Sequence, residues 1–295
     1  EICACLVGSE MCIRDSFSPR ANIRFNPSEA VNLRVSYAGG YRAPQAFDED
    51  MHIAVVGGKR VRIRLADDLK EERSHSVSLS ADLYHNFGRV QTNLLVEGFY
   101  TILDDVFALR DLEDTDDGGK IKERYNGSGA AVRGFNVEGR AIFTRWFELQ
   151  AGVTLQQSRY RKPERWSEDA DVPPVRRMFR TPDAYGYFTA AFRPVRNFTA
   201  DLTGTCTGSM LVQHMAGSGV AQDAAVSTPS FFDMNVRLSY DLRIYKEITL
   251  QLYGGVQNLF NAYQKDFDKG ADRDSGYIYG PSLPRSWFVG AKVSF

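Results

Sequence analysis

The residues best suited to chemistry are carboxylates gathered between positions 104 and 119. Seven Asp and Glu residues fall in this stretch. Oxygen-rich clusters suit Ca²⁺, which accepts six to eight oxygen ligands, although the spacing does not match the twelve-residue EF-hand loop. The cluster is therefore either a solvated acidic loop or a calcium site in an outer loop, with no other cofactor expected. The candidate calcium ligands are Asp111, Asp114, Asp116 and Asp117.

Histidine and nucleophile patterns give no indication of catalysis. Of the four histidines, no two lie four residues apart, and the chain contains neither HExxH nor GxSxG. These motifs would place paired imidazoles on a zinc ion or a serine on a strand-to-helix turn. We therefore expect that the protein is not an enzyme.

Aromatic, cationic and imidazole side chains occur in segments that we interpret as long loops. Large rigid rings can grip a ligand, and they can equally form an aromatic girdle at a membrane boundary. A surface histidine without a ligand is the simpler alternative for each imidazole. The candidate substrate-binding residues are Tyr41, Arg42, His52, Trp166, His214, Tyr263 and Tyr277.

Composition limits the classes of protein to be considered. The 295 residues carry 36 Lys and Arg against 37 Asp and Glu, a balance that argues against a nucleic-acid partner. Mean hydropathy is −0.34, and no apolar run approaches the length of a transmembrane helix. Membrane β-strands alternate in polarity, so this composition leaves a transmembrane β-barrel possible.

Residues 1–16 differ from the rest of the chain. They show no period and no basic region typical of a signal peptide. LVGSEMCIRDS resembles a translated sequencing adapter, so we interpret residues 1–16 as a non-native leader and 17–295 as the barrel portion; a genuine Cys-rich segment is the alternative. Three of the four cysteines lie in the leader, which leaves Cys206 alone and predicts no disulfide framework.

From residue 17 onward the chain alternates apolar and polar residues with period two, which is typical of half-buried β-strands. The pattern predicts about eleven strands of roughly 8–14 residues, near the length that crosses a bilayer at a tilt. The expected strands cover residues 19–26, 31–37, 75–85, 90–107, 121–144 (interrupted near the glycines at 127, 129 and 134), 147–160, 184–192, 198–207, 232–242, 247–260 and 284–295.

The connections between these strands alternate strictly in length. Short turns are followed by loops of roughly a dozen to 35 residues, including an acidic loop at 108–119. Long loops of this kind are unusual in a compact soluble domain, whereas outer-membrane barrels combine short periplasmic turns with long extracellular loops. The alternation alone does not tell whether the apolar face meets lipid or a soluble core, so a β-sandwich remains the alternative to the barrel.

Several segments resemble the C-terminal half of the β-barrel of a TonB-dependent outer-membrane receptor, in the form found in Bacteroidetes. In chain order, these segments are SYAGGYRAPQAFDEDMHI, LKEERSHSVSLSADL, FYTILDDVFAL, RYNGSGAAVRGFNVEGR, GVQNLFNAYQKDF and PRSWFVGAKVSF. Glu71 departs from the family pattern, which usually has proline there. The order and spacing match over about residues 17–295.

The resemblance implies an all-β, antiparallel transmembrane barrel fragment, about eleven strands of a 22-strand barrel whose plug domain is missing. It implies location in the Gram-negative outer membrane in contact with lipid, and uptake of a scarce nutrient such as a ferric siderophore or cobalamin. The implied partners are the TonB–ExbB–ExbD energy complex, through the plug, and the barrel-assembly machinery. A passive porin-like barrel and a soluble carbohydrate-binding β-sandwich are the alternatives. The residues implied in the assembly signal are Trp287, Val289, Val293 and Phe295.

Overall fold

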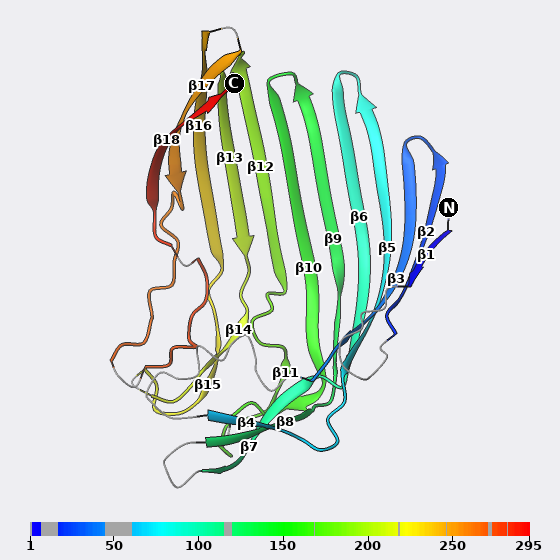
Figure 1. Cartoon of the computed structure of the whole chain (residues 1–295), viewed down its shortest axis with the longest axis vertical. Helices are drawn as coiled ribbons and strands as arrows, with labels where there is room; N and C mark the ends of the chain where they lie inside the picture. Colours follow the sequence, from blue (N-terminus) through cyan, green and yellow to red (C-terminus); the bar gives the residue numbers. More distant parts are fainter. Residues whose placement is uncertain are drawn as a thin grey trace.

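The computed structural model describes residues 2–6, 17–44, 61–114, 120–167, 169–217, 219–245, 247–270, 273–281 and 283–295. Eleven long strands form one curved antiparallel wall, in which each strand pairs with the next long strand of the chain (Figure 1). These strands are β2 (Pro19–Ser28), β3 (Val31–Arg42), β5 (Glu72–Phe87), β6 (Val90–Asp104), β9 (Ala130–Thr144), β10 (Phe147–Glu164), β12 (Ala184–Val195), β13 (Phe198–Thr207), β16 (Phe231–Tyr245), β17 (Ile248–Gln257) and β18 (Ser286–Ser294).

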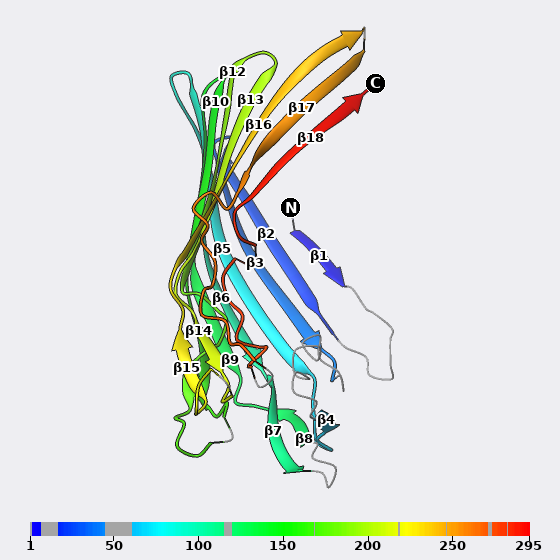
Figure 2. The same cartoon turned by 90° about the vertical axis from the view of Figure 1, so that its left-hand side faces the viewer.

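The strand that precedes this wall is β1 (Ile2–Leu6), which pairs antiparallel with β2. This pairing does not bear on the origin of residues 1–16, and their interpretation as a non-native leader stays a prediction. The wall is open: β2, extended by the short strand β1, lies at one edge and β18 at the other, and the wall bows between them (Figure 2). In the described residues, no helix is long and apolar enough to cross a membrane.

The predicted alternation of connections is confirmed. Short turns join the long strands at one end of the wall, and long connections gather at the other (Figure 1). Small strands occur in those long connections. They are β4 (Val61–Leu65), β7 (Phe107–Asp114), β8 (Lys120–Asn126), β11 (Val175–Arg177), β14 (Leu211–His214) and β15 (Ala224–Ser227).

One sequence-based expectation needs correction at this end, and another is confirmed in part. The segment 108–119, expected to be a loop, contributes most of β7, which pairs antiparallel with β8. The interruption predicted in the strand over 121–144 is confirmed between β8 and β9, where Gly129 adopts a φ of 79° that a side chain would disfavour. Gly134, by contrast, lies inside β9 without a break.

The register places the apolar residues of neighbouring strands on one shared face. Leu79 is opposite Gly98, Gly98 is opposite Phe135, and Phe135 is opposite Leu155. The side chains of Leu79, Phe135 and Leu155 are all more than half exposed. The described strands therefore form a single layer with an exposed apolar face, whereas a β-sandwich would bury that face against a second sheet.

The opposite face carries a polar network. Arg140 forms an ion pair of 2.6 Å with Glu148, and Gln150 donates a hydrogen bond of 2.7 Å to Glu138. A buried hydrophobic cluster lies instead at the long-loop end, where Val212, Phe231, Tyr277 and Tyr279 pack together. The wall has one polar face and one exposed apolar face, and its long loops pack together at one end. These features match the predicted barrel class.

Candidate functional site

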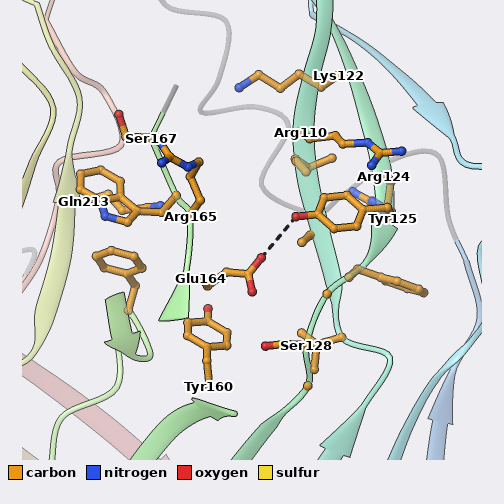
Figure 3. A pocket seen from close by; sticks show the side chains of 18 of the residues that line it. Arg110, Lys122, Arg124, Tyr125, Ser128, Tyr160, Glu164, Arg165, Ser167 and Gln213 are labelled. Atoms are coloured by element: carbon orange, nitrogen blue, oxygen red, sulfur yellow. Dashed lines mark hydrogen bonds between the residues drawn. The ribbon is translucent and has the colours of Figure 1, made fainter. Parts of the chain in front are cut away.

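A cavity of about 730 Å³ lies at the long-loop end, between the small sheet and the extended end of β10. The small sheet has the order β4–β8–β7, with β4 running parallel to β8. Strands β7 and β8 supply one side of the cavity, and Glu164 to Ser167 supply the other (Figure 3). The cavity is therefore assembled from connections that are far apart in sequence.

Cationic side chains dominate the polar lining. Among the described residues, five of them line the cavity, together with the Glu164 carboxylate. Two of these cations form ion pairs with carboxylates outside the lining: Arg42 lies 3.5 Å from Glu72, and Arg110 contacts Glu123. The five cations are Arg42, Arg110, Lys122, Arg124 and Arg165.

Three of these cations contact aromatic rings. The Arg42 guanidinium lies 5.6 Å from the centre of the Phe107 ring, and that of Arg124 lies 5.8 Å from the same ring. Arg110 lies 4.9 Å from the Tyr125 ring. Cation–π contacts of this length are attractive and strengthen when water is excluded. Arg124 is only 1% exposed, so its charge is fixed within the site.

Glu164 and Tyr125 face each other across the cavity (Figure 3). The Tyr125 hydroxyl donates a hydrogen bond of 3.3 Å to Glu164 Oε1. Burial raises the pKa of Tyr125, and the Glu164 carboxylate raises this pKa further, while Arg110 opposes the shift. The tyrosine is therefore a neutral donor at physiological pH.

Trp166 supplies a donor without a partner. Its ring meets Phe179 edge to face, with 5.3 Å between the ring centres. Trp166 Nε1 is buried and has no hydrogen-bond partner among the described residues. Buried polar atoms are almost always paired, so an oxygen atom of a bound molecule is a natural partner for this nitrogen.

The neighbouring loops form a second polar network beside the cavity. His214 Nε2 lies 2.9 Å from Asp268 Oδ1, and its ring stacks on Tyr277 with 3.7 Å between centres. The hydroxyls of Tyr277 and Tyr279 donate to Asp266 at 2.9 and 2.6 Å. Burial opposes ionisation of Asp266, but the Tyr279 and Tyr277 hydrogen bonds outweigh it and hold the pKa of Asp266 below its usual value.

A buried amide stabilises the same region. Gln264 is 1% exposed, and its Nε2 donates to the Tyr277 carbonyl at 3.0 Å. Its Oε1 accepts from the Tyr279 backbone N–H at 2.8 Å. Desolvation raises the pKa of Tyr279 strongly, and hydrogen bonding to Asp266 adds to this shift. The loop after β17 is thus fixed beside the β14–β15 hairpin.

The predicted ligand-binding residues are distributed unevenly around this site. Arg42 and Trp166 line the cavity together, and His214 stacks on Tyr277 in the adjacent network. Tyr41 precedes Arg42 on β3 and therefore points to the other side of that strand, whereas Tyr263 lies half-buried after β17. His52 lies outside the described residues. Ligand binding by each of these residues stays a prediction.

The sequence reasoning missed most of the cavity lining. The basic residues of β8 alternate as Lys122 and Arg124, and Phe107 opens β7. That local period indicates a charged hairpin, whereas the sequence analysis assigns these residues to an acidic loop and to the start of an interrupted strand. Glu164 and Arg165 lie just beyond the expected end of the strand over 147–160.

The predicted calcium ligands are only partly described. Asp116 and Asp117 lie outside the described residues, and Asp111 and Asp114 are described in their backbone alone, within β7. Among the residues that the structure does describe, no group of three His, Cys, Asp or Glu side chains could hold a metal ion. The calcium site stays a prediction.

The predicted assembly residues lie at the β18 edge of the wall. Trp287, Val289 and Val293 belong to β18, and their side chains are between 56% and 90% exposed. Phe295 follows the strand and is 98% exposed. Their exposure leaves them accessible, while their role in assembly stays a prediction.

Comparison with known proteins identifies one matching protein family. Residues 10–259 match a family model described as TonB dependent receptor-like, beta-barrel. No curated protein matches the chain.

Solved structures of receptors resemble the fold. The ferric-catecholate import receptor Fiu from Escherichia coli K12 has a TM-score of 0.61 and 17% identity, over 94% of this chain and 35% of that one. The ferric enterobactin receptor PfeA from Pseudomonas aeruginosa has a TM-score of 0.62 and 15% identity, over 94% and 40%. The FrpB iron transporter from Neisseria meningitidis has a TM-score of 0.62 and 16% identity, over 94% and 39%. The chain thus spans well under half the length of these proteins, and at such identity the likeness shows the fold alone.

Proposed function

The chain belongs to the TonB-dependent receptor β-barrel family, and from this premise we propose that it forms part of an outer-membrane receptor that imports an anionic ferric siderophore. The observation that carries the proposal is the cavity at the long-loop end, lined by five cations and a cluster of aromatic rings. The wall supplies the lipid-facing and lumen-facing surfaces, and the long-loop end is the extracellular end.

The chemistry of the cavity favours a ligand with negative charge and flat rings. Ferric complexes of catecholates are multiply anionic and present aromatic faces, so they could use both the guanidinium groups and the rings. An anionic oxygen would also accept a hydrogen bond from Trp166 Nε1, the buried donor without a partner among the described residues. Cobalamin carries little net charge and would gain less from this lining. Proteins of similar fold are named as ferric-catecholate and ferric enterobactin receptors, which supports this ligand class.

Import against a concentration gradient needs an energy source, because the outer membrane has no ATP supply of its own. We therefore include the TonB–ExbB–ExbD complex as the energising partner and the barrel-assembly machinery as the partner in insertion. Family membership supports both partners and a location in the Gram-negative outer membrane.

The proposal is tested by binding to the receptor with its complete barrel. A ferric tris-catecholate is titrated against the purified receptor in detergent, and quenching of tryptophan fluorescence is followed. Lys122→Gln combined with Arg165→Gln removes two lining charges and is expected to weaken binding by about tenfold or more, since hydrogen bonds between charged groups are about twice as strong as neutral ones.

Two further variants test the role of the Trp166 donor and control for the change in charge. Trp166→Phe keeps an aromatic ring but removes the Nε1 donor together with part of the indole, so it should weaken binding by roughly two- to tenfold. Arg89→Gln with Arg196→Gln makes the same charge change in the short turns at the far end, and should have no effect. Equal binding of a neutral ferric trihydroxamate, unaffected by the lining variants, would contradict the proposal.

A further inference from the structure

Glu164 is the carboxylate that lines the loop cavity together with the five cations, and it lies half-buried at the end of β10. Its Oε1 accepts the Tyr125 hydrogen bond of 3.3 Å and would lie 3.5 Å from a Cβ atom built at Gly127. Its Oε2 accepts no hydrogen bond from the residues that the structure describes. One carboxylate oxygen is therefore held by the protein, and the other is left for a bound molecule.

Neighbouring cations do not neutralise this carboxylate. Arg161, three residues earlier on β10, lies 2.6 Å from Asp104, and Arg110 contacts Glu123. Within the described ranges, no Lys or Arg forms an ion pair with the Glu164 carboxylate. A carboxylate without a countercharge repels an anion, so Glu164 disfavours a ligand that is negative on every side.

The groups around Glu164 suit an ammonium ion. Tyr160 lines the same cavity, and its hydroxyl points toward Glu164 (Figure 3). The Tyr125 hydroxyl, which donates to Oε1, keeps lone pairs that can accept. An ammonium group has three N–H donors, which match Glu164 Oε2 and the two phenol oxygens, and the aromatic rings attract its charge further.

Two other cationic groups fit this position less well. A guanidinium group binds a carboxylate best through both oxygens, but Glu164 Oε1 already accepts from Tyr125. A bare metal ion needs several ligands, and among the described residues no group of three His, Cys, Asp or Glu side chains could hold one. A primary ammonium group needs only one free oxygen and is therefore the favoured partner of Glu164.

We propose that Glu164 is a specificity-determining residue, which selects ferric siderophores that carry a primary ammonium group beside their anionic iron centre. The ammonium group pairs with Glu164 Oε2 on one side of the cavity, while the anionic centre meets the cationic side chains of β7 and β8 on the other. The inference rests on the proposed function and adds a second charge, of opposite sign, to the ligand. It explains why a cavity suited to anions also holds a carboxylate.

The test compares two probes on the receptor with its complete barrel in detergent. One is the ferric complex of a tris-catecholate whose backbone carries a primary amine, and the other is the same complex with that amine acetylated. Quenching of tryptophan fluorescence gives both affinities. The unaltered receptor should bind the amine probe at least about tenfold more tightly, because acetylation removes a hydrogen bond between charged groups.

Glu164→Gln keeps the shape of the side chain and removes its charge. It should remove the preference for the amine probe, and it should bind the acetylated probe at least as tightly as the unaltered receptor does. A purely structural role of Glu164 would instead weaken the binding of both probes alike. Glu29→Gln makes the same charge change in the short turn between β2 and β3, at the far end of the wall, and should leave the preference unchanged.

Equal affinity of the unaltered receptor for the two probes, or a preference that survives in the Glu164→Gln protein, would overturn the inference. The first comparison needs no variant, so misfolding of a variant does not weaken it. Equal binding of both probes that is weakened by Lys122→Gln with Arg165→Gln rejects only the role of Glu164. Failure of the unaltered receptor to bind either probe rejects the proposed function together with that role.

Discussion

Replacing Gln264 with leucine should release the loop after β17 while leaving the wall intact. The Gln264 side chain is 1% exposed and bonds two backbone groups of the same loop, the Tyr277 carbonyl at 3.0 Å and the Tyr279 N–H at 2.8 Å. Leucine has a similar volume but no polar atoms, so Gln264→Leu leaves both backbone groups without these partners and adds little cavity cost.

The expected loss of stability follows from the two backbone groups that lose their hydrogen-bond partner. A buried donor or acceptor that loses its partner costs about 1–3 kcal/mol, so the free energy of local opening should fall by at least about 2 kcal/mol. That change corresponds to roughly 30-fold faster amide exchange when closing is faster than exchange. The Tyr279 amide should respond most, because its own acceptor is removed.

Hydrogen exchange of the detergent-solubilised receptor, read by mass spectrometry over the segment containing Tyr279, measures this effect. Gln222→Leu is the matched control, because Gln222 bonds Asp169 at an exposed position in a nearby loop, where substitutions usually change stability by no more than about 0.5 kcal/mol. If Tyr279 exchanges equally fast in the Gln264→Leu protein and the unaltered protein, the side chain does not hold the loop and the reasoning fails.

Two further outcomes test other parts of the structure. The lowered pKa of Asp266 means that its contribution to loop stability is present at neutral pH and is lost as pH falls through its folded pKa, below the ordinary range of Asp. The protection factor of the Tyr279 amide, which corrects for the intrinsic dependence of exchange on pH, should fall there, and Tyr279→Phe should flatten this dependence. A Cβ at Gly134 would lie 2.3 Å from the Leu155 carbonyl oxygen, so Gly134→Ala should destabilise the wall by about 1–3 kcal/mol in a thermal unfolding experiment. Gly139→Ala on the same strand meets nothing within 4 Å and should be neutral or slightly stabilising; equal unfolding temperatures for the two variants would refute the clash.

The wall could be predicted from the sequence because its determinants are local. Period-two alternation, as in the segment 232–242, fixes which residues share a face, and the turn residues mark where each hairpin reverses. The strand over 198–207 was predicted with the bounds that β13 has. The family resemblance then indicated a barrel, which the residues alone left open against a sandwich.

The cavity could not be predicted, because its determinants are contacts between distant connections. Burial of Arg124 depends on the Phe107 ring and on neighbours from other loops, and nothing in the sequence around it distinguishes it from a solvated cation. Gln264 is a similar case, since its partners are backbone groups rather than recognisable side chains. The pairing of β4 with β8 is parallel and joins different connections, so no hairpin signal marks it.

This parallel pairing also orders events during folding. Strand β4 follows β3 and β8 precedes β9, so the β5–β6 hairpin lies between the two partners in sequence. Bringing β4 to β8 costs conformational entropy. This cost is smallest once the β5–β6 hairpin has formed and brought its two ends together. The small sheet, and with it the cavity, should therefore be the last part of this region to form and the first to open. If the chain imports a ligand as proposed, the long-stranded wall can therefore be complete and resistant to heat before the ligand cavity has formed.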